Sequence, residues 1–213
     1  MKIARAPYLQ QQPLWPTQGR HILAHYDAES VTVYQAYRPS IGNYAVEHQH
    51  FGGEWSYGRM SWIKPNFLWM MYRCGWGQKP GQEVVLAIRI ARRGFDEILA
   101  QAVHSSFDPE VYASHAAWKQ RVANSDVRLQ WDPDHDPKGQ KVPRRAIQLG
   151  LRGEVLKAFA QQWCIGIQDL SAWVREQHRH VVANRLTQLE TPVERVYPVA
   201  DRNVATHLGL ASP

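Results

Sequence analysis

The chain has 213 residues and a formal net charge of +6, with 44% hydrophobic and 21% charged residues. These values are typical of a globular domain and exclude a disordered or fibrous chain. Residues 67–72 form the longest apolar run, far shorter than the roughly 20 residues of a membrane-spanning helix. The amino-terminal residues lack the apolar segment of a secretory signal, so we expect a cytoplasmic protein with no membrane partner.

The elements predicted at the start of the chain are an arm, a strand and a helix. Residues 1–20 are rich in proline and glutamine without periodicity, which predicts an irregular arm. Residues 30–37 alternate β-branched and aromatic side chains, which predicts a strand that ends at Arg38, before a proline. Ser40 is then expected to cap a helix over residues 41–51.

The remaining elements alternate between short strands and helices. We predict strands at 57–64, 84–90, 127–131, 145–149 and 164–167, and helices at 67–74, 93–104, 109–123, 153–162 and 171–182. The fold class is therefore α+β, with about six short strands in a mixed or split sheet and about five helices. Residues 21–199 form the single expected domain, and residues 200–213 form a carboxy-terminal tail.

Arginine and tryptophan are unusually frequent, and two groups of them follow strand ends. The chain has 18 Arg against 7 Lys, and nine Trp. Tyr37 and Arg38 end the first strand, while Ser61, Trp62 and Lys64 precede the next helix. Arginine forks bind phosphate and aromatic faces stack on bases, so these two junctions predict an anion or nucleotide pocket.

The densest polar segment is Asp132, Asp134, His135 and Asp136. Its spacing imitates the start of an EF-hand loop, but the glycine and the final glutamate of that loop are absent, so no calcium site is predicted. The histidines likewise lack the spacing of a zinc motif, and no metal is expected. Two interpretations of the segment remain open: a tight turn, or a functional loop compensated by flanking arginines, which are Arg128, Arg144 and Arg145.

Four long strings resemble the domain of unknown function 4291 family. They are VYQAYRPSIGNYAVEHQHFGG, RMSWIKPNFLWMMYRCGWG, SDVRLQWDPDHDP and RRAIQLGLRGEVL, and the resemblance covers residues 15–199. It implies no activity, but it indicates that the strand-end groups belong to the motifs of the family.

The order of elements also resembles, more distantly, the ADP-ribosyltransferase superfamily. In that family an Arg or His on the first strand helps hold NAD, a Ser on the second supports the nicotinamide ribose, and a late Glu or Gln reaches the ribose or the acceptor. The resemblance assigns these catalytic roles to Arg38, Ser61 and Gln148. It implies NAD as the cofactor, bound by Tyr37, Arg38, Ser61, Trp62, Lys64 and Tyr72.

Three functional hypotheses follow. The first is an NAD-dependent, ADP-ribosyltransferase-like enzyme that acts on a nucleic acid or another acceptor. The second is a non-catalytic nucleic-acid-binding module in which arginines contact phosphates and tryptophans stack on bases. The third is a structural domain whose tryptophans fill the core. The expected substrate or nucleic-acid contacts are Arg128, Asp132, Asp134, His135, Asp136, Arg144, Arg145 and Arg152.

Overall fold

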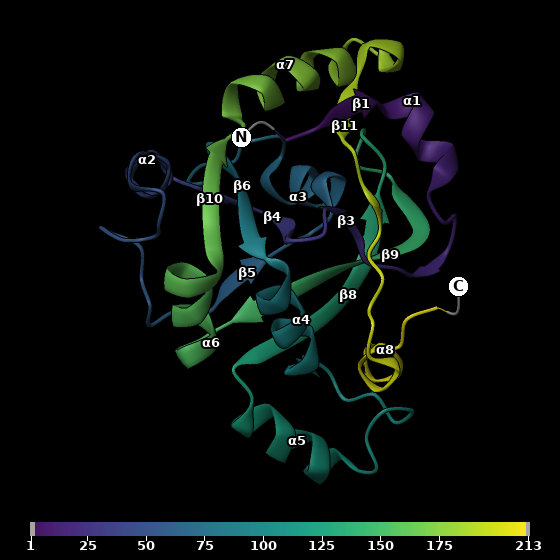
Figure 1. The fold of residues 1–213 in the computed structure, drawn as a ribbon. Helices are drawn as coiled ribbons and strands as arrows, with labels where there is room; N and C mark the ends of the chain where they lie inside the picture. The colour runs from purple at the N-terminus through teal and green to yellow at the C-terminus, as the bar shows by residue number, and fades with distance from the viewer. Residues whose placement is uncertain (1–2, 212–213) are drawn as a thin grey trace.

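The computed structural model describes residues 3–211, in which eight α-helices and twelve strands form an α+β fold with three sheets (Figure 1). The first sheet has the order β10 (Cys164–Asp169), β6 (Val84–Ala91), β4 (Ser30–Tyr37), β3 (Leu23–Tyr26) and β12 (Arg195–Val196). The second has the order β2 (Gly19–Arg20), β9 (Lys141–Leu151), β8 (Val127–His135) and β7 (Ala102–His104), and β5 (Ser61–Ile63) also pairs with β9. The third pairs β1 (Arg5–Pro7) with β11 (Glu190–Pro192). The α+β class expected from the sequence is confirmed.

The two central strands of the first sheet supply side chains to a core on each face. In β4, Val31 and Val33 join one buried cluster and Tyr34 joins the other. In β6, Leu86 faces the first cluster and Val85 the second. Successive strand residues point to opposite faces, so a strand covered on both sides is apolar throughout.

The first and second sheets meet at one short contact between β4 and the end of β5. The amide of Tyr34 donates to the carbonyl of Lys64 at 2.7 Å, and the amide of Lys64 donates to the carbonyl of Tyr34 at 3.3 Å. Apart from this bridge the two strands have different partners. Strand β4 pairs with β6 along its whole length, and β5 pairs with β9. The residues that follow Tyr34 and precede Lys64 therefore lie where the two sheets diverge.

The helices lie around these sheets, with α5 and α7 at opposite ends of the molecule (Figure 1). They are α1 (Tyr8–Gln11), α2 (Pro39–His48), α3 (Phe67–Cys74), α4 (Arg92–Ala100), α5 (His115–Asn124), α6 (Gly153–Ala158), α7 (Ser171–Val182) and α8 (Arg202–Leu208). The longest, α7, has 12 residues, and no helix within residues 3–211 is long and apolar enough to cross a membrane. The helix predicted over 67–74 is confirmed as α3, and the Asn66 side chain caps it by accepting from the amide of Trp69 at 2.7 Å.

Helix α2 begins two residues earlier than predicted and has a different cap. Arg38 is the N-cap residue, without a side-chain cap bond, and Pro39 occupies the first turn. Proline's fixed φ suits this position. Ser40 lies inside the helix, and its hydroxyl donates instead to the Glu54 carboxylate at 2.7 Å. The helix ends at His48, three residues before the predicted end, and its C-cap residue Gln49 lies in the left-handed region.

Gly42 lets α2 approach β6 closely, and its replacement is the first test of the packing. A Cβ at Gly42 would stand 2.5 Å from side-chain atoms of Val84. We expect Gly42→Ala to lower the free energy of unfolding by about 1–3 kcal/mol, because overpacking outweighs the higher helix propensity of alanine. Urea unfolding measures the change. Gly58→Ala is the control, because a Cβ there meets only the Ser56 hydroxyl, at 3.7 Å; equal losses in both variants would contradict the packing described.

Two predicted helices are shorter in the structure. The helix expected over 93–104 ends at Ala100, because residues 102–104 form β7 and pair in parallel with β8. The helix expected over 109–123 begins only after Ser114, whose hydroxyl accepts from the amide of Ala117. Residues 108–112 form a separate turn, in which the amides of residues 111 and 112 donate to the carbonyl of Asp108. The hydroxyl of Tyr112 accepts from the amide of His104 at 3.0 Å and ties this turn to β7.

The other corrections concern the lengths and ends of the predicted elements. The strand predicted at 57–64 is reduced to β5, which is the part that reaches β9. Helix α6 stops at Ala158 and continues as a π-helical turn over Phe159–Trp163. Residues 1–20, expected to be irregular, contain β1, α1 and β2, and the tail contains α8, capped by the Asp201 carboxylate. The short strands β1 and β2 form through pairing with the distant strands β11 and β9, which local periodicity does not detect.

Candidate functional site

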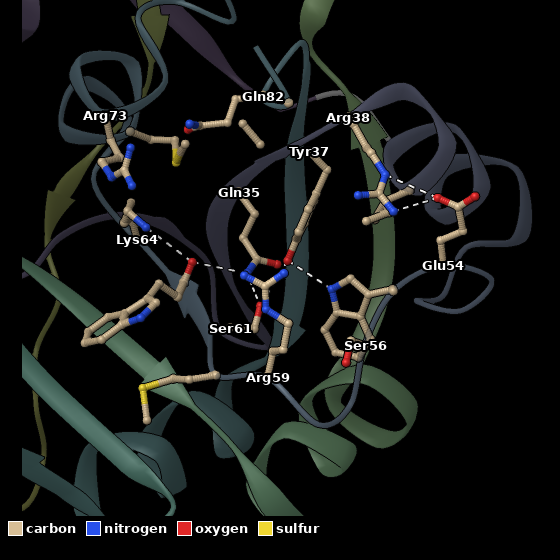
Figure 2. Close-up of a pocket in the computed structure, with 17 residues that line it drawn as sticks. Gln35, Tyr37, Arg38, Glu54, Ser56, Arg59, Ser61, Lys64, Arg73 and Gln82 are labelled. Carbon is tan, nitrogen blue, oxygen red and sulfur yellow. Dashed lines mark hydrogen bonds and ion pairs between the residues drawn. The ribbon is translucent and has the colours of Figure 1, made fainter. Parts of the chain in front are cut away.

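A cavity of about 420 Å³ opens where β4 and β5 diverge (Figure 2). Its walls are the end of β4, the segment 54–62, one side of α3 and the loop at 81–82. Both strand-end groups predicted from the sequence contribute to it. The predicted residues that line it are Tyr37, Arg38, Ser61, Trp62 and Lys64.

The hydroxyl of Ser61 is the centre of a hydrogen-bond network inside this cavity. The Gln35 amide nitrogen donates to Ser61 Oγ at 2.7 Å and to the carbonyl of Trp62 at 3.1 Å. Tyr37 Oη lies 2.9 Å from Ser61 Oγ and accepts from the indole of Trp55 at 3.0 Å. Burial raises the pKa of Tyr37, so its hydroxyl stays protonated at neutral pH.

Counting donors and acceptors shows what the network leaves for a ligand. The carbonyl of Trp62 can only accept, which fixes the NH₂ end of the Gln35 amide on this side. The hydroxyls of Tyr37 and Ser61 hold two protons, of which one lies between them and the other has no acceptor. The Gln35 Oε1 atom is buried and has no hydrogen-bond partner. Because that oxygen is closed to solvent, the network offers a ligand one hydroxyl donor, which a sugar hydroxyl or a carbonyl oxygen can accept from.

Arg38 is held at the cavity mouth by a carboxylate. Its Nη2 and Nε atoms donate to Oε2 of Glu54 at 2.7 and 3.2 Å, and Nε also donates to Ser40 Oγ at 3.0 Å (Figure 2). The bonds from Ser40 and Arg38 lower the pKa of Glu54, so this carboxylate is ionised. It is the one acidic side chain among the residues that line the cavity.

Three further cations face the cavity: Arg59, Lys64 and Arg73. Lys64 is only 5% exposed, and its Nζ donates to the carbonyl of Trp62 at 3.3 Å. Burial and, after it, the charge of Arg73 lower the pKa of Lys64 to about 8. With four cations and one carboxylate, the lining favours an anionic ligand.

Comparison with known proteins identifies the family of the chain. The model of the domain of unknown function (DUF4291) matches residues 21–197, which include every residue that lines the cavity. The chain belongs to the DUF4291 family. Among curated proteins, none matches it. The cavity is therefore a feature within the DUF4291 domain, and its chemistry follows from the residues that line it.

Two residues predicted for the site lie outside the lining of the cavity in this DUF4291 domain. Gln148, on β9, donates to Oδ2 of Asp132 at 2.7 Å, and Gln130 donates to Oδ1 at 3.0 Å. The charge of Asp132 raises the pKa of Lys64, which lines the cavity, against the larger lowering by burial and Arg73. Tyr72 stacks instead on His135, with ring centroids 3.5 Å apart.

The acidic segment is mostly strand rather than loop. Residues 132–135 extend β8, and Asp136 begins the hairpin turn, where its Oδ1 accepts from the amides of Lys138 and Gln140. Asp134 is fully buried in an ion pair with Arg144, at 2.6 Å. The interpretation of a tight turn therefore holds for Asp136, while Asp134 has a role in the core.

The four arginines predicted to contact phosphates differ in their surroundings. Arg128 donates to backbone carbonyls of residues 122, 125 and 127, and Arg152 donates to those of 122, 123 and 125. Arg144 is buried against Asp134, whereas Arg145 is exposed. Three of the four guanidinium groups are thus bonded within the domain.

Sequence reasoning missed six polar residues of the cavity: Gln35, Glu54, Ser56, Arg59, Arg73 and Gln82. Gln35 interrupts an apolar strand, and such a polar residue in a buried strand is the kind of signal that could have found it. Glu54 lies in a segment without any motif, whereas Arg59 and Arg73 lie within the string of residues 59–77 that carries the family resemblance, a signal that could have found them. In the described part of the chain, no three His, Cys, Asp or Glu side chains come together where they could hold a metal ion.

Proposed function

We propose that this cavity binds NAD and that the protein is an ADP-ribosyltransferase-like enzyme. The observation that carries the proposal is the meeting, in one cavity, of Arg38 and Ser61 from the ends of two diverging strands. The excess of cations suits a pyrophosphate, and the aromatic rings of Trp55 and Trp62 suit a base or nicotinamide ring.

In the proposed reaction an acceptor displaces nicotinamide from NAD. The C1′–N bond breaks, its electron pair leaves with nicotinamide, and an oxygen or nitrogen of the acceptor bonds to C1′ and loses its proton. The transition state carries positive charge on the sugar ring, which a nearby carboxylate stabilises. We assign this role to Glu54, because it is ionised and lines the cavity. Ser61 donates to a ribose hydroxyl, while the Gln35 amide donates to Ser61 Oγ and holds it in place.

Three expectations stay predictions. They are the role of Gln148 toward ribose or acceptor, the nucleic-acid-binding alternative and the cytoplasmic location. The alternative receives less support, because Arg128, Arg144 and Arg152 donate to groups of the domain itself. Arg145 is the exposed member of that set. We therefore propose a nucleic acid chiefly as an acceptor of the transferred ADP-ribose.

Labelled NAD tests the proposal. The purified protein is incubated with NAD labelled in the adenosine part, together with RNA, DNA and protein acceptors in separate reactions. We expect transfer of label to one acceptor class, release of nicotinamide, and a rise in melting temperature with NAD alone. Absence of both turnover and thermal shift at millimolar NAD would overturn the proposal.

A further inference from the structure

Lys64 and Arg73 lie together on the side of the cavity away from Arg38 and Glu54 (Figure 2). Lys64 follows β5 and Arg73 belongs to α3. Among the ion pairs within residues 3–211, none includes either of them. The Lys64 amine has the Trp62 carbonyl as its acceptor, which leaves two of its three possible donor hydrogens unused when it is protonated.

The proximity of these two cations is unfavourable by itself. A buried amine loses hydration, and a like charge beside it adds repulsion. The ionisable groups that affect Lys64 are Arg73, which lowers its pKa, and Asp132 and Cys74, which raise it. Asp132 already accepts from two glutamine amides. Two cations placed this way lack the counter-charge that a ligand could supply.

We propose that Lys64 and Arg73 form a subsite for a phosphate or pyrophosphate group. A phosphate can accept from the fork of Arg73 and from the Lys64 amine at once, in charge-assisted bonds. The network around Ser61 in the same cavity offers a hydroxyl donor to an oxygen of the ligand. The ligand class is therefore a phosphorylated sugar or nucleotide, and only the choice of NAD rests on the proposed function.

The subsite predicts a proton taken up when phosphate binds. Near pH 8 the Lys64 amine is partly neutral, because burial and Arg73 lower its pKa to about 8. An anion beside it favours the charged form and raises the pKa, so a proton moves from the buffer to Nζ. Below about pH 6.5 the amine is already protonated, and binding leaves its charge unchanged.

Calorimetric titration with pyrophosphate at pH 8, in two buffers of different ionisation enthalpy, tests both the phosphate subsite and the proton uptake. We expect Arg73→Gln to weaken binding by about tenfold or more, as loss of a charge-assisted bond does. Arg93→Gln, on α4 and exposed, is the matched control and should bind normally. Lys64→Gln should weaken binding and remove part of the buffer-dependent enthalpy.

The outcomes separate this inference from the proposed function. Equal affinity in the unaltered protein, Arg73→Gln and Lys64→Gln would overturn the subsite, even if NAD turnover were observed. Pyrophosphate binding that depends on both residues, without any response to NAD, would retain the subsite and reject NAD as its ligand. Because Arg73 is exposed, its variant is expected to fold and remains informative if Lys64→Gln does not.

Discussion

Replacing Glu54 by Gln is expected to reduce turnover of NAD by about 100-fold, the lower end of the range for loss of one group that stabilises a charged transition state. The amide keeps an oxygen that can accept from Arg38 and Ser40, so the geometry at the cavity mouth is preserved. What is lost is the negative charge beside the sugar ring.

Steady-state kinetics of nicotinamide release distinguish this effect from weaker binding. We expect kcat to fall while the KM for NAD changes little, because the charge acts mainly in the transition state. Glu47→Gln is the matched control, since Glu47 is exposed on α2 and does not line the cavity. Unchanged kcat in Glu54→Gln, in a protein that turns over NAD, would remove Glu54 from the mechanism.

Replacing Arg144 by Met is expected to lower the free energy of unfolding by about 3–5 kcal/mol, because it leaves a buried carboxylate without its partner. Arg144 Nε donates to Asp134 Oδ2 at 2.8 Å, and Nη2 forms an ion pair with the same oxygen at 2.6 Å. Arg144 Nη1 donates to the carbonyl of Pro16 at 2.6 Å. Glu194 is also buried, and burial raises its pKa well above the usual value. The charge of Asp134 adds to this rise, and the charge of Arg144 opposes it. Removing the cation therefore leaves two carboxyl groups in the core.

Urea unfolding of three variants tests the contribution of this ion pair. Arg145→Met changes the exposed neighbour and should shift stability by less than about 0.5 kcal/mol. The double variant Arg144→Met with Asp134→Leu should be more stable than Arg144→Met alone, because no unpaired carboxylate remains at position 134. A small loss in Arg144→Met, equal to that of Arg145→Met, would show that the pair is not needed for stability.

The sequence predicted those elements whose signals are local. Strand β4 shows alternation along its whole length, and α3 has both a capping asparagine, Asn66, and a glycine, Gly75, with φ 58° at its end. Strands such as β2 and β12 have two residues each and exist through pairing with β9 and β3. No local pattern identifies a strand whose stability comes from its partner.

The same contrast, between local signals and tertiary packing, explains which residues of the cavity the sequence predicts. Arg38, Ser61 and Lys64 were predicted because strand ends before a proline or a helix are visible in the sequence. Glu54 reaches Arg38 across a loop that follows Gly53, a residue with φ 59°. Arg73 reaches the cavity because α3 packs beside β4. These two contacts depend on tertiary packing, which periodicity and spacing do not encode.

A crystal structure of the protein grown with a non-hydrolysable NAD analogue tests the central claim most directly. We expect the analogue in the cavity between the diverging ends of β4 and β5, with its pyrophosphate at Lys64 and Arg73 and its nicotinamide ribose near Ser61. Analogue bound at another surface, or a cavity that stays empty at saturating concentration, would contradict the claim.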